Sequence, residues 1–186
     1  MLARLATISA ALTVSLSTAG PATGQEPPPL IERGAIRLTL GGAQAIVEGA
    51  QEKAREMGLK VNITVVDEGG HPIAFVRMDG ARSASSYTSM TKAVAAATLR
   101  QPTGPVPAGV EAPDALLNLS LQLTASASGG KVTTLSGGVP VVVDGQIIGG
   151  VGVGGATGEQ DAEIARAGIA RLLSSIDSQD SDTNGR

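Results

Sequence analysis

The chain has 186 residues, a formal net charge of −3 at pH 7, one histidine and no cysteine. Its mild acidity, with only one Phe, one Tyr and no Trp, argues against nucleic-acid binding, which depends on basic surface and on aromatic stacking. With so few aromatic residues, the core must be built from Ala, Val, Leu and Ile, and the absence of cysteine rules out disulfides.

The first residues carry the pattern of a secretory signal peptide. Arg4 is followed by an apolar run over residues 5–16, and small residues precede a cleavage site at Gln25. The run is too short and too often interrupted by Ser and Thr for a membrane-spanning helix. We therefore expect residues 1–24 to be removed and residues 25–37 to form a linker, with an uncleaved anchor as the alternative. The mature chain, without a membrane span, is expected to be periplasmic or secreted.

The first predicted helix begins after Thr39, a good N-cap residue, and ends at Gly58, because glycine suits the left-handed position that follows a helix. The apolar residues between them keep helical spacing. The next segment alternates β-branched residues and predicts a hairpin, with strands over 61–67 and 72–78 and a turn over 68–71.

A helix over 85–99 is expected to bury one face, formed by Tyr87, Met90, Val94 and Ala97. A proline-rich loop follows this helix. The remaining predicted elements are a short helix over 114–125, a strand near 132–135, a hairpin over 137–153, a helix over 159–176 and a polar tail over 177–186. Helices interleaved with antiparallel hairpins predict an α+β fold, with one domain over residues 38–176.

The glycine-rich segment from Gly137 to Asp161 is the most informative part of the chain. Asp144-Gly145 between apolar runs predicts a tight hairpin turn, because such turns need positive φ. The second strand runs into a glycine loop, and Thr157 is placed to cap the following helix together with Gln160. Asp161, in the first helical turn, is expected to complement the helix dipole.

Backbone N–H groups in such a glycine loop can hold an anion. The alternative is that the glycines serve only tight turns and close packing. The candidate ligand-binding residues of the loop are Gly154, Gly155, Thr157 and Gly158.

Two blocks, VVDEGGH…RMDGA and GGVPVVVDG…GVGVGGATGEQD, together resemble the GlcG/HbpS-like haem-binding family, which is related to the C-terminal domain of PduO-type proteins. The similarity extends over residues 38–173. The resemblance implies a profilin-like antiparallel sheet flanked by helices. It also implies a homo-oligomer and the binding of haem or of iron-related ligands.

His71 is the only histidine, and it lies at the predicted tip of the first hairpin. A neutral imidazole is a usual axial ligand of haem iron, so His71 is the candidate metal ligand; the alternative is an exposed turn residue. Met78, Met90 and Tyr87 are the other possible axial donors. Haem pockets generally offer apolar and aromatic surface, of which this chain has little, so a subunit interface could supply it.

Arg77 and Lys92 are candidate cationic partners for haem propionates or for a small carboxylate ligand, with solvated surface charges as the alternative. Asp67 and Glu68 stand close to His71 in the chain, and the three side chains together could bind iron or transfer protons. Alternatively, Asp67 only accepts hydrogen bonds from the amides of the turn.

Three functions remain open at this point. The leading hypothesis is an exported haem-binding or haem-handling protein that forms a homo-oligomer. The second is an isomerase or hydratase acting on an organic acid, with the glycine loop as anion site and Asp67, Glu68, His71 or Lys92 as the proton-transfer group. The third is an oligomeric interaction or signalling protein.

Overall fold

The computed structural model describes residues 34–106 and 111–184. The expected signal peptide, residues 1–24, and most of the expected linker therefore lie outside the described residues. The chain divides into two units, Met1–Gly34 and Ala35–Arg186, and all described helices and strands belong to the second. Within the described residues, no helix is both long enough and apolar enough to cross a membrane.

One four-stranded sheet, ordered β2-β1-β4-β3, organises the second unit. Every neighbouring pair of strands is antiparallel, and both predicted hairpins are confirmed. At the tip of the second hairpin, Asp144 and Gly145 have φ values of 48° and 73°, as a tight turn of this kind requires. The strands are β1 (Asn62–Asp67), β2 (Pro72–Arg77), β3 (Gly138–Val143) and β4 (Gln146–Gly154).

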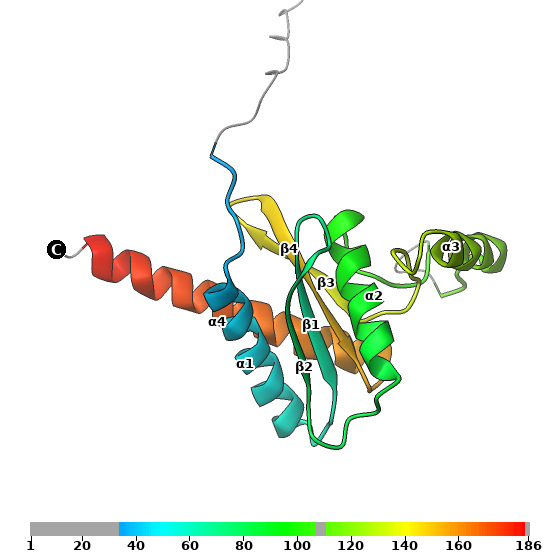
Figure 1. Cartoon of the computed structure of the whole chain (residues 1–186), viewed down its shortest axis with the longest axis horizontal. Helices are drawn as coiled ribbons and strands as arrows, with labels where there is room; N and C mark the ends of the chain where they lie inside the picture. Colours follow the sequence, from blue (N-terminus) through cyan, green and yellow to red (C-terminus); the bar gives the residue numbers. More distant parts are fainter. Residues whose placement is uncertain (1–33, 107–110, 185–186) are drawn as a thin grey trace, which may run out of the picture. The chain divides into compact units, whose positions relative to one another are not determined.

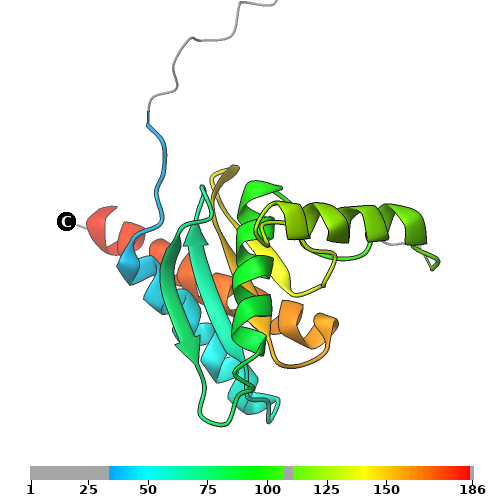
Figure 2. The ribbon, with the colours of Figure 1, turned by 45° about the vertical axis from the view of Figure 1, so that its right-hand side comes forward.

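Helices cover both faces of the sheet (Figure 1). α1 and α4 pack against each other and cover one face, whereas α2 lies on the other face, over β1, β3 and β4. The third helix, α3, extends away from the sheet on the α2 side (Figure 2). The helices are α1 (Leu40–Glu56), α2 (Ser85–Thr98), α3 (Ala115–Ala127) and α4 (Gly158–Asn184). The predicted α+β class, an antiparallel sheet flanked by helices, is confirmed.

Alternation along β1 divides the core between the two faces of the sheet. Ile63 and Val65 belong to the large cluster that includes α1 and α4, whereas Val66 packs in a smaller cluster with Ala93 and Ala97 of α2. All five side chains are almost completely buried. With so few aromatic residues available, the core is filled by branched aliphatic residues and closely approaching backbones.

The glycines of β4 allow α2 to lie directly on the sheet. A Cβ atom at Gly152 would overlap the backbone of Ser89, and one at Gly150 would overlap the carbonyl oxygen of Ala93. No other residue fits there without moving the helix, because backbone atoms cannot swing aside as flexible side chains do. For these two glycines, close packing is sufficient explanation.

Several predicted elements need correction. Residues 132–135 form no strand, because the sheet ends at β3 and pairs with no further strand among the described residues. The last helix is longer than predicted: α4 continues to Asn184, so most of the expected polar tail is helical. The helix predicted over 114–125 is α3, and Asp114 is its N-cap, accepting a hydrogen bond from the Leu117 amide at 2.9 Å.

The buried face of α2 also differs from the prediction. Tyr87 is 79% exposed, and Met90 and Val94 are only partly buried. The sheet instead contacts small and polar residues of α2, because glycines in β4 leave no room for larger ones. The residues of α2 that are buried are Ser85, Ser89, Lys92, Ala93, Ala95, Ala96 and Ala97.

Candidate functional site

The β1–β2 turn is organised around the carboxylate of Asp67. Its Oδ1 atom accepts hydrogen bonds from the Gly69 amide at 2.9 Å and from the His71 amide at 2.8 Å. Both carboxylate oxygens also lie 3.2 Å from the Nδ1 atom of His71. Asp67 therefore satisfies the turn amides, one of the alternatives that the sequence left open, and orients the imidazole as well.

The surroundings of Asp67 change its pKa. Partial burial acts to raise the pKa of this carboxyl, but the hydrogen bonds from the His71 and Gly69 amides and the contact with the His71 ring outweigh it. The net result is a pKa below the ordinary value of 3.8. Asp67 is accordingly an anion over the whole physiological range and a stable acceptor for the imidazole N–H.

His71 presents its second ring nitrogen to solvent, because its side chain is 80% exposed and Nδ1 faces Asp67. With Nδ1 protonated, Nε2 carries the free lone pair. Glu68 is an exposed neighbour in the same turn. The described residues include no group of three or more His, Cys, Asp or Glu side chains placed to hold a metal ion, so Asp67, Glu68 and His71 do not form a metal site by themselves.

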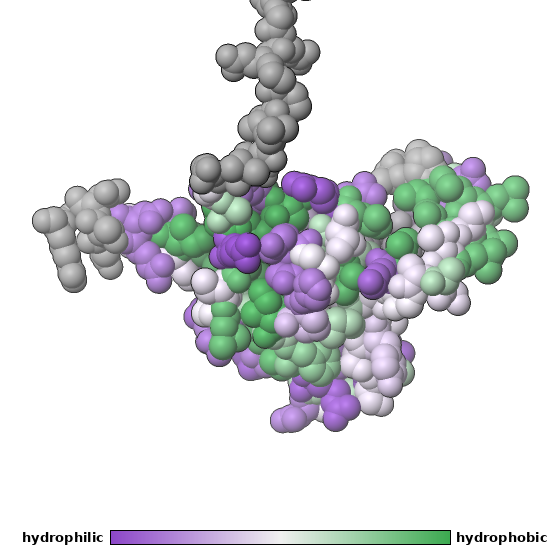
Figure 3. Space-filling model, turned by 45° about the horizontal axis from the view of Figure 1, so that its top comes forward, coloured by the Kyte–Doolittle hydropathy of each residue, from purple (hydrophilic) through white to green (hydrophobic). Residues whose placement is uncertain are grey.

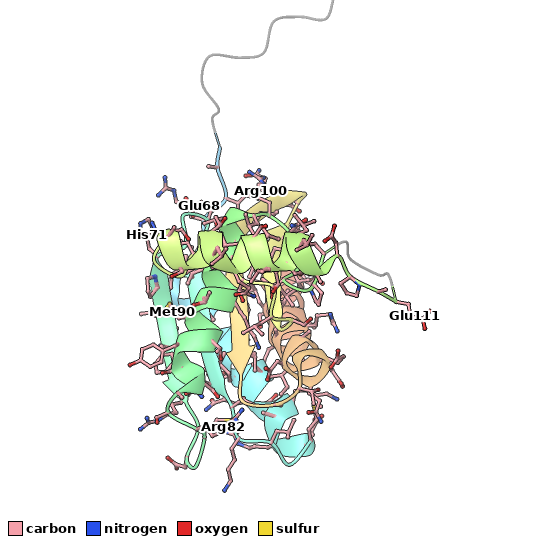
Figure 4. All side chains as sticks on the ribbon, turned by 90° about the vertical axis from the view of Figure 1, so that its right-hand side faces the viewer. Glu68, His71, Arg82, Met90, Arg100 and Glu111 are labelled. Atoms are coloured by element: carbon pink, nitrogen blue, oxygen red, sulfur yellow. The ribbon has the colours of Figure 1, made fainter. Side chains whose placement is uncertain are left out.

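Apolar side chains lie on the same side of the molecule as His71. A Cβ atom at Gly70, beside His71, would contact Val94 and Thr98 of α2, so the turn rests against the C-terminal half of that helix. Figure 4 shows His71 and Met90 on one side of α2. Tyr87 lies one turn before Met90 on this side of the helix.

Phe75 extends this surface onto the edge strand β2. It pairs with Thr64, and Thr64 faces α2, since its hydroxyl lies 2.9 Å from that of Ser89. Phe75 is 45% exposed, so the only Phe and the only Tyr of the chain both reach solvent here. We call this surface the His71 face; it comprises His71, Phe75, Tyr87, Met90 and Val94.

Arg77 and Met78 do not belong to the His71 face. Arg77 ends β2, about 20 Å along the strand from His71 at the usual rise per residue, and Met78 packs against the large core cluster. Both line a different cavity of about 490 Å³, together with Arg55, Lys60 and Asp79. Arg77 is therefore not placed to act with His71 or with Lys92.

Lys92 is buried and paired, so its interpretation as a solvated surface charge is wrong. Its Nζ atom donates to Asp161 Oδ2 and to the Val153 carbonyl oxygen, each at 2.8 Å. Lys92 and Asp161 are only 4% and 1% exposed. Asp161 does lie in the first turn of α4, as predicted, but the main partner of its carboxylate is Lys92 of α2 rather than the helix dipole.

Burial dominates the titration of Asp161. Removal from water raises the pKa of this carboxyl above its ordinary value of 3.8. The hydrogen bond and charge of Lys92 and the amides of Ala156 and Gly155 act in the opposite direction without cancelling it. The salt bridge thus compensates only part of the cost of burying the charge.

The loop before α4 is closed by groups of the protein itself. The predicted capping box is confirmed: the Thr157 amide donates to Gln160 Oε1 at 3.1 Å, and the Gln160 amide donates to Thr157 Oγ1 at 3.3 Å. The Ala156 amide donates to Asp161 Oδ1 at 3.1 Å. The loop amides around Asp161 are therefore not an open anion site, because this carboxylate already occupies them.

A cavity of about 540 Å³ opens beside this loop, and we call it the glycine-loop cavity. Of the predicted site residues, it brings together Lys92, Gly155 and Gly158. Gly154 and Thr157 do not line it, and a Cβ atom at Gly154 would collide with the Ser85 carbonyl oxygen at 2.6 Å. The residues that line the cavity and bear on its chemistry are Arg82, Ser85, Lys92, Ser136, Glu159 and Asp161.

The four candidate proton-transfer groups are divided between the two regions. Asp67, Glu68 and His71 lie on the turn, whereas Lys92 lies in the glycine-loop cavity. A single active site using all four is therefore not formed. Arg82 and Ser85 were missed by the sequence analysis, because arginine and serine near a helix start are common and carry no distinctive spacing.

The fold and these surfaces define an α+β protein with helices on both faces of an antiparallel sheet and an exposed histidine oriented by a carboxylate. The chain belongs to the HbpS-like family, since the family described as "Haem degrading protein HbpS-like" matches residues 38–170. Protein GlcG of Escherichia coli K12 is 43% identical over 111 residues, which are 60% of this chain and 76% of GlcG. The resemblance inferred from the sequence motifs is thus confirmed.

Solved structures agree with this assignment. The protein ORFY of Klebsiella pneumoniae has a TM-score of 0.66 and 31% identity, covering 78% of this chain and 98% of that one. A structure described as a PduOC:heme complex has a TM-score of 0.59 and 26% identity, covering 73% of this chain and 95% of that one. The shared fold therefore extends over nearly the whole of both neighbours.

Proposed function

We propose that this protein binds or handles haem on the His71 face, with His71 Nε2 as the axial ligand. The observation that carries the proposal is the pairing of Asp67 with Nδ1, 3.2 Å away. Metal-ligating histidines usually hydrogen-bond a carboxylate or carbonyl through their other nitrogen, which sets the tautomer and the ring orientation. Bound haem would supply an iron centre that accepts this nitrogen.

The residues of the His71 face fit the other requirement of haem, an apolar surface for the macrocycle. Phe75 and Tyr87 are 45% and 79% exposed, although burial of aromatic residues is favourable. Exposed apolar groups gathered on one surface commonly mark a binding site. The family description as haem-degrading and the haem complex of a relative support the same conclusion.

A haem titration of the purified protein, followed by absorbance, tests this proposal. We expect a saturable Soret shift that is lost or spectrally altered in His71→Ala. Arg100→Ala, which removes an exposed charge from the end of α2, is the matched control and should titrate like the unaltered protein. A Soret shift that is identical in His71→Ala, or the absence of any saturable shift, would refute the assignment of His71.

The proposal includes self-association through α3. Leu116, Leu119 and Leu123 are 77%, 56% and 65% exposed, and they follow helical spacing along one side of the helix. Figure 3 shows the resulting apolar surface at the end of the molecule formed by α3. Within the described residues, α3 makes no extensive contact with another helix or strand, so we propose that a second copy of the chain covers it.

Export to the periplasm or the exterior is also part of the proposal. It rests on the charged, apolar and small-residue pattern of residues 1–24. Expression in a bacterial host with a periplasm, followed by fractionation and mass spectrometry, tests it. A periplasmic or secreted product beginning at or near Gln25 is expected, and an intact chain retained in the cytoplasm would contradict it.

A further inference from the structure

We propose that the glycine-loop cavity binds a small oxyanion, namely a carboxylate or phosphate on a compact polar molecule. This site is separate from the His71 face. His71 lies near the C-terminal half of α2, whereas Arg82 precedes its N-terminus (Figure 4). A 14-residue helix is about 21 Å long, so a ligand in the cavity does not touch His71. The inference does not depend on haem binding.

The ammonium group of Lys92 has one hydrogen bond left to give. An ammonium carries three N–H donors, and two of them are used by Asp161 Oδ2 and the Val153 carbonyl oxygen. No acceptor for the third occurs among the described residues, although the side chain is only 5% exposed. Since Lys92 lines the cavity, an oxygen atom of a ligand would complete its hydrogen bonding.

Ser85 supplies a second unsatisfied donor. The residue is 7% exposed and lines the cavity, and its hydroxyl has no hydrogen-bond partner among the described residues. Among those residues, the one fully enclosed side-chain polar atom without a partner is Oδ1 of Asn62. The Ser85 hydroxyl is therefore not fully enclosed by protein, and it is accessible to solvent or ligand from the cavity.

The buried carboxylate of the cavity is already satisfied. Asp161 accepts from Lys92 through Oδ2 and from the Ala156 amide through Oδ1, and the other carboxylate, Glu159, is exposed at the rim. Arg82 is also exposed, and its side chain makes one long contact of 3.5 Å, to the Gly155 carbonyl oxygen. Lys92 and Arg82 thus keep unused N–H donors at the cavity while its buried carboxylate is already paired, which favours an oxyanion. A guanidinium can bind an oxyanion with two parallel hydrogen bonds.

Two glycines keep the site in shape. A Cβ atom at Gly137 would lie 2.8 Å from Lys92 Nζ and 2.7 Å from Asp161 Cβ, and the φ of Gly137 is +118°. A Cβ atom at Gly158 would lie 2.7 Å from Ser136 Cβ. Side chains at these positions would displace the ammonium or crowd the cavity, so glycine at both positions keeps the cavity open.

The test is an amide NMR titration of the purified, ¹⁵N-labelled protein with lactate, inorganic phosphate and lactamide. Lactate and lactamide have nearly the same size, but only lactate carries an oxyanion. We expect saturable shifts of the Ser85, Gly155 and Gly158 amides with lactate or phosphate and none with lactamide. The tighter binder of the two anions decides between a carboxylate and a phosphate ligand.

Variants locate the binding site. Arg82→Gln and Ser85→Ala should each weaken the titration by about tenfold or more, as expected for the loss of a hydrogen bond involving a charged group. Arg100→Gln and His71→Ala should leave it unchanged. No saturable shift with either anion, equal shifts with lactamide, or unchanged affinity in both cavity variants would overturn the proposal. Because His71→Ala is expected to alter only the haem titration, failure of one proposal is distinguishable from failure of the other.

Discussion

Lys92 and Asp161 form the one salt bridge of the described residues in which both side chains are almost fully buried. Such pairs add little net stability, because desolvation offsets the attraction, but removing one partner leaves an uncompensated charge. The other salt bridges, such as Lys53–Glu163, are partly exposed and contribute little. The position of Lys92 is therefore maintained by Asp161, and the stability of α2 against α4 depends on both residues.

We predict that Lys92→Met lowers the free energy of unfolding by about 3 to 5 kcal/mol, because it leaves the Asp161 carboxylate buried without its cation. Urea unfolding of the variant and of the unaltered protein measures the difference. Lys60→Met, which removes an exposed lysine, is the control and should change stability by less than about 0.5 kcal/mol. Equal loss in both variants would show that the buried pair has no special role.

Asp67 gives a prediction about pH. Its folded pKa is lower than its ordinary value of 3.8, so the folded state binds fewer protons than the unfolded state between the two values. The stabilisation by Asp67 is therefore present above pH 3.8 and is lost as the pH falls through the lowered pKa.

Asp67→Ala should accordingly lower the free energy of unfolding by about 1 kcal/mol at neutral pH. The expected loss is small because the carboxylate is partly exposed to solvent. The difference from the unaltered protein should shrink as the solution is acidified. Urea unfolding at a series of pH values measures it, with the exposed neighbour in Glu68→Ala as control. A difference in unfolding free energy that stays constant as the pH falls below 3.8 would argue against ionisation of Asp67 as the cause.

At the scale of elements, the contact between α2 and β4 decides the architecture. Glycines on β4 and small residues on α2 bring the helix onto the sheet backbone. This close approach places Lys92 where it can reach Val153 and Asp161. It also leaves Tyr87 and Met90 on the outer side of α2, where they contribute to the His71 face.

We predict that Gly152→Ala destabilises the protein by about 1 to 3 kcal/mol, because the added methyl group overlaps the backbone of Ser89 and Ala93 and forces a shift of α2. Gly41→Ala in α1 is the matched control. Its methyl group would meet nothing closer than the Thr39 hydroxyl at 3.8 Å, and alanine should stabilise the helix by about 0.5 to 1 kcal/mol. Thermal unfolding compares the two; equal midpoints would refute the packing argument.

At the scale of the whole molecule, three surfaces serve three proposed contacts: the His71 face, the glycine-loop cavity and α3. The first two involve different sides of α2, since Tyr87 is exposed on the outer side whereas Lys92 is buried toward Val153 and Asp161. The third is an apolar helix whose one buried residue is Ala125, and such a helix gains most of its stability from packing against a partner. The proposed self-association and the proposed ligand binding thus involve different residues.

We predict that the double variant Leu119→Ser, Leu123→Ser reduces the molar mass in solution, because it removes two exposed apolar side chains from the proposed contact between copies. Light scattering coupled to size-exclusion chromatography measures the mass. Ser120→Ala, a substitution on the same helix, should leave the mass unchanged. A monomeric unaltered protein, or a double variant of unchanged mass, would contradict the proposed role of α3.

Elements that depend only on neighbouring residues could be predicted from the sequence. The Asp144-Gly145 turn, the Thr39 cap and the Thr157–Gln160 capping box were all predicted and are all present, because each needs only a few consecutive residues. The family could also be predicted, since its motifs are local. The strand expected at 132–135 was wrong, because a strand exists only if another strand pairs with it.

Contacts between side chains distant in the sequence could not be predicted, because they depend on how the helices pack on the sheet. Lys92 and Asp161 are 69 residues apart in the chain, and nothing in their local sequence distinguishes a buried pair from two solvated charges. Burial of Lys92 depends on glycines of β4 that admit α2 to the sheet. The packing of α2 also sets the distance between the candidate residues on the turn and those in the cavity. This packing consists of contacts between segments distant in the sequence, so the separation could not be predicted from local patterns.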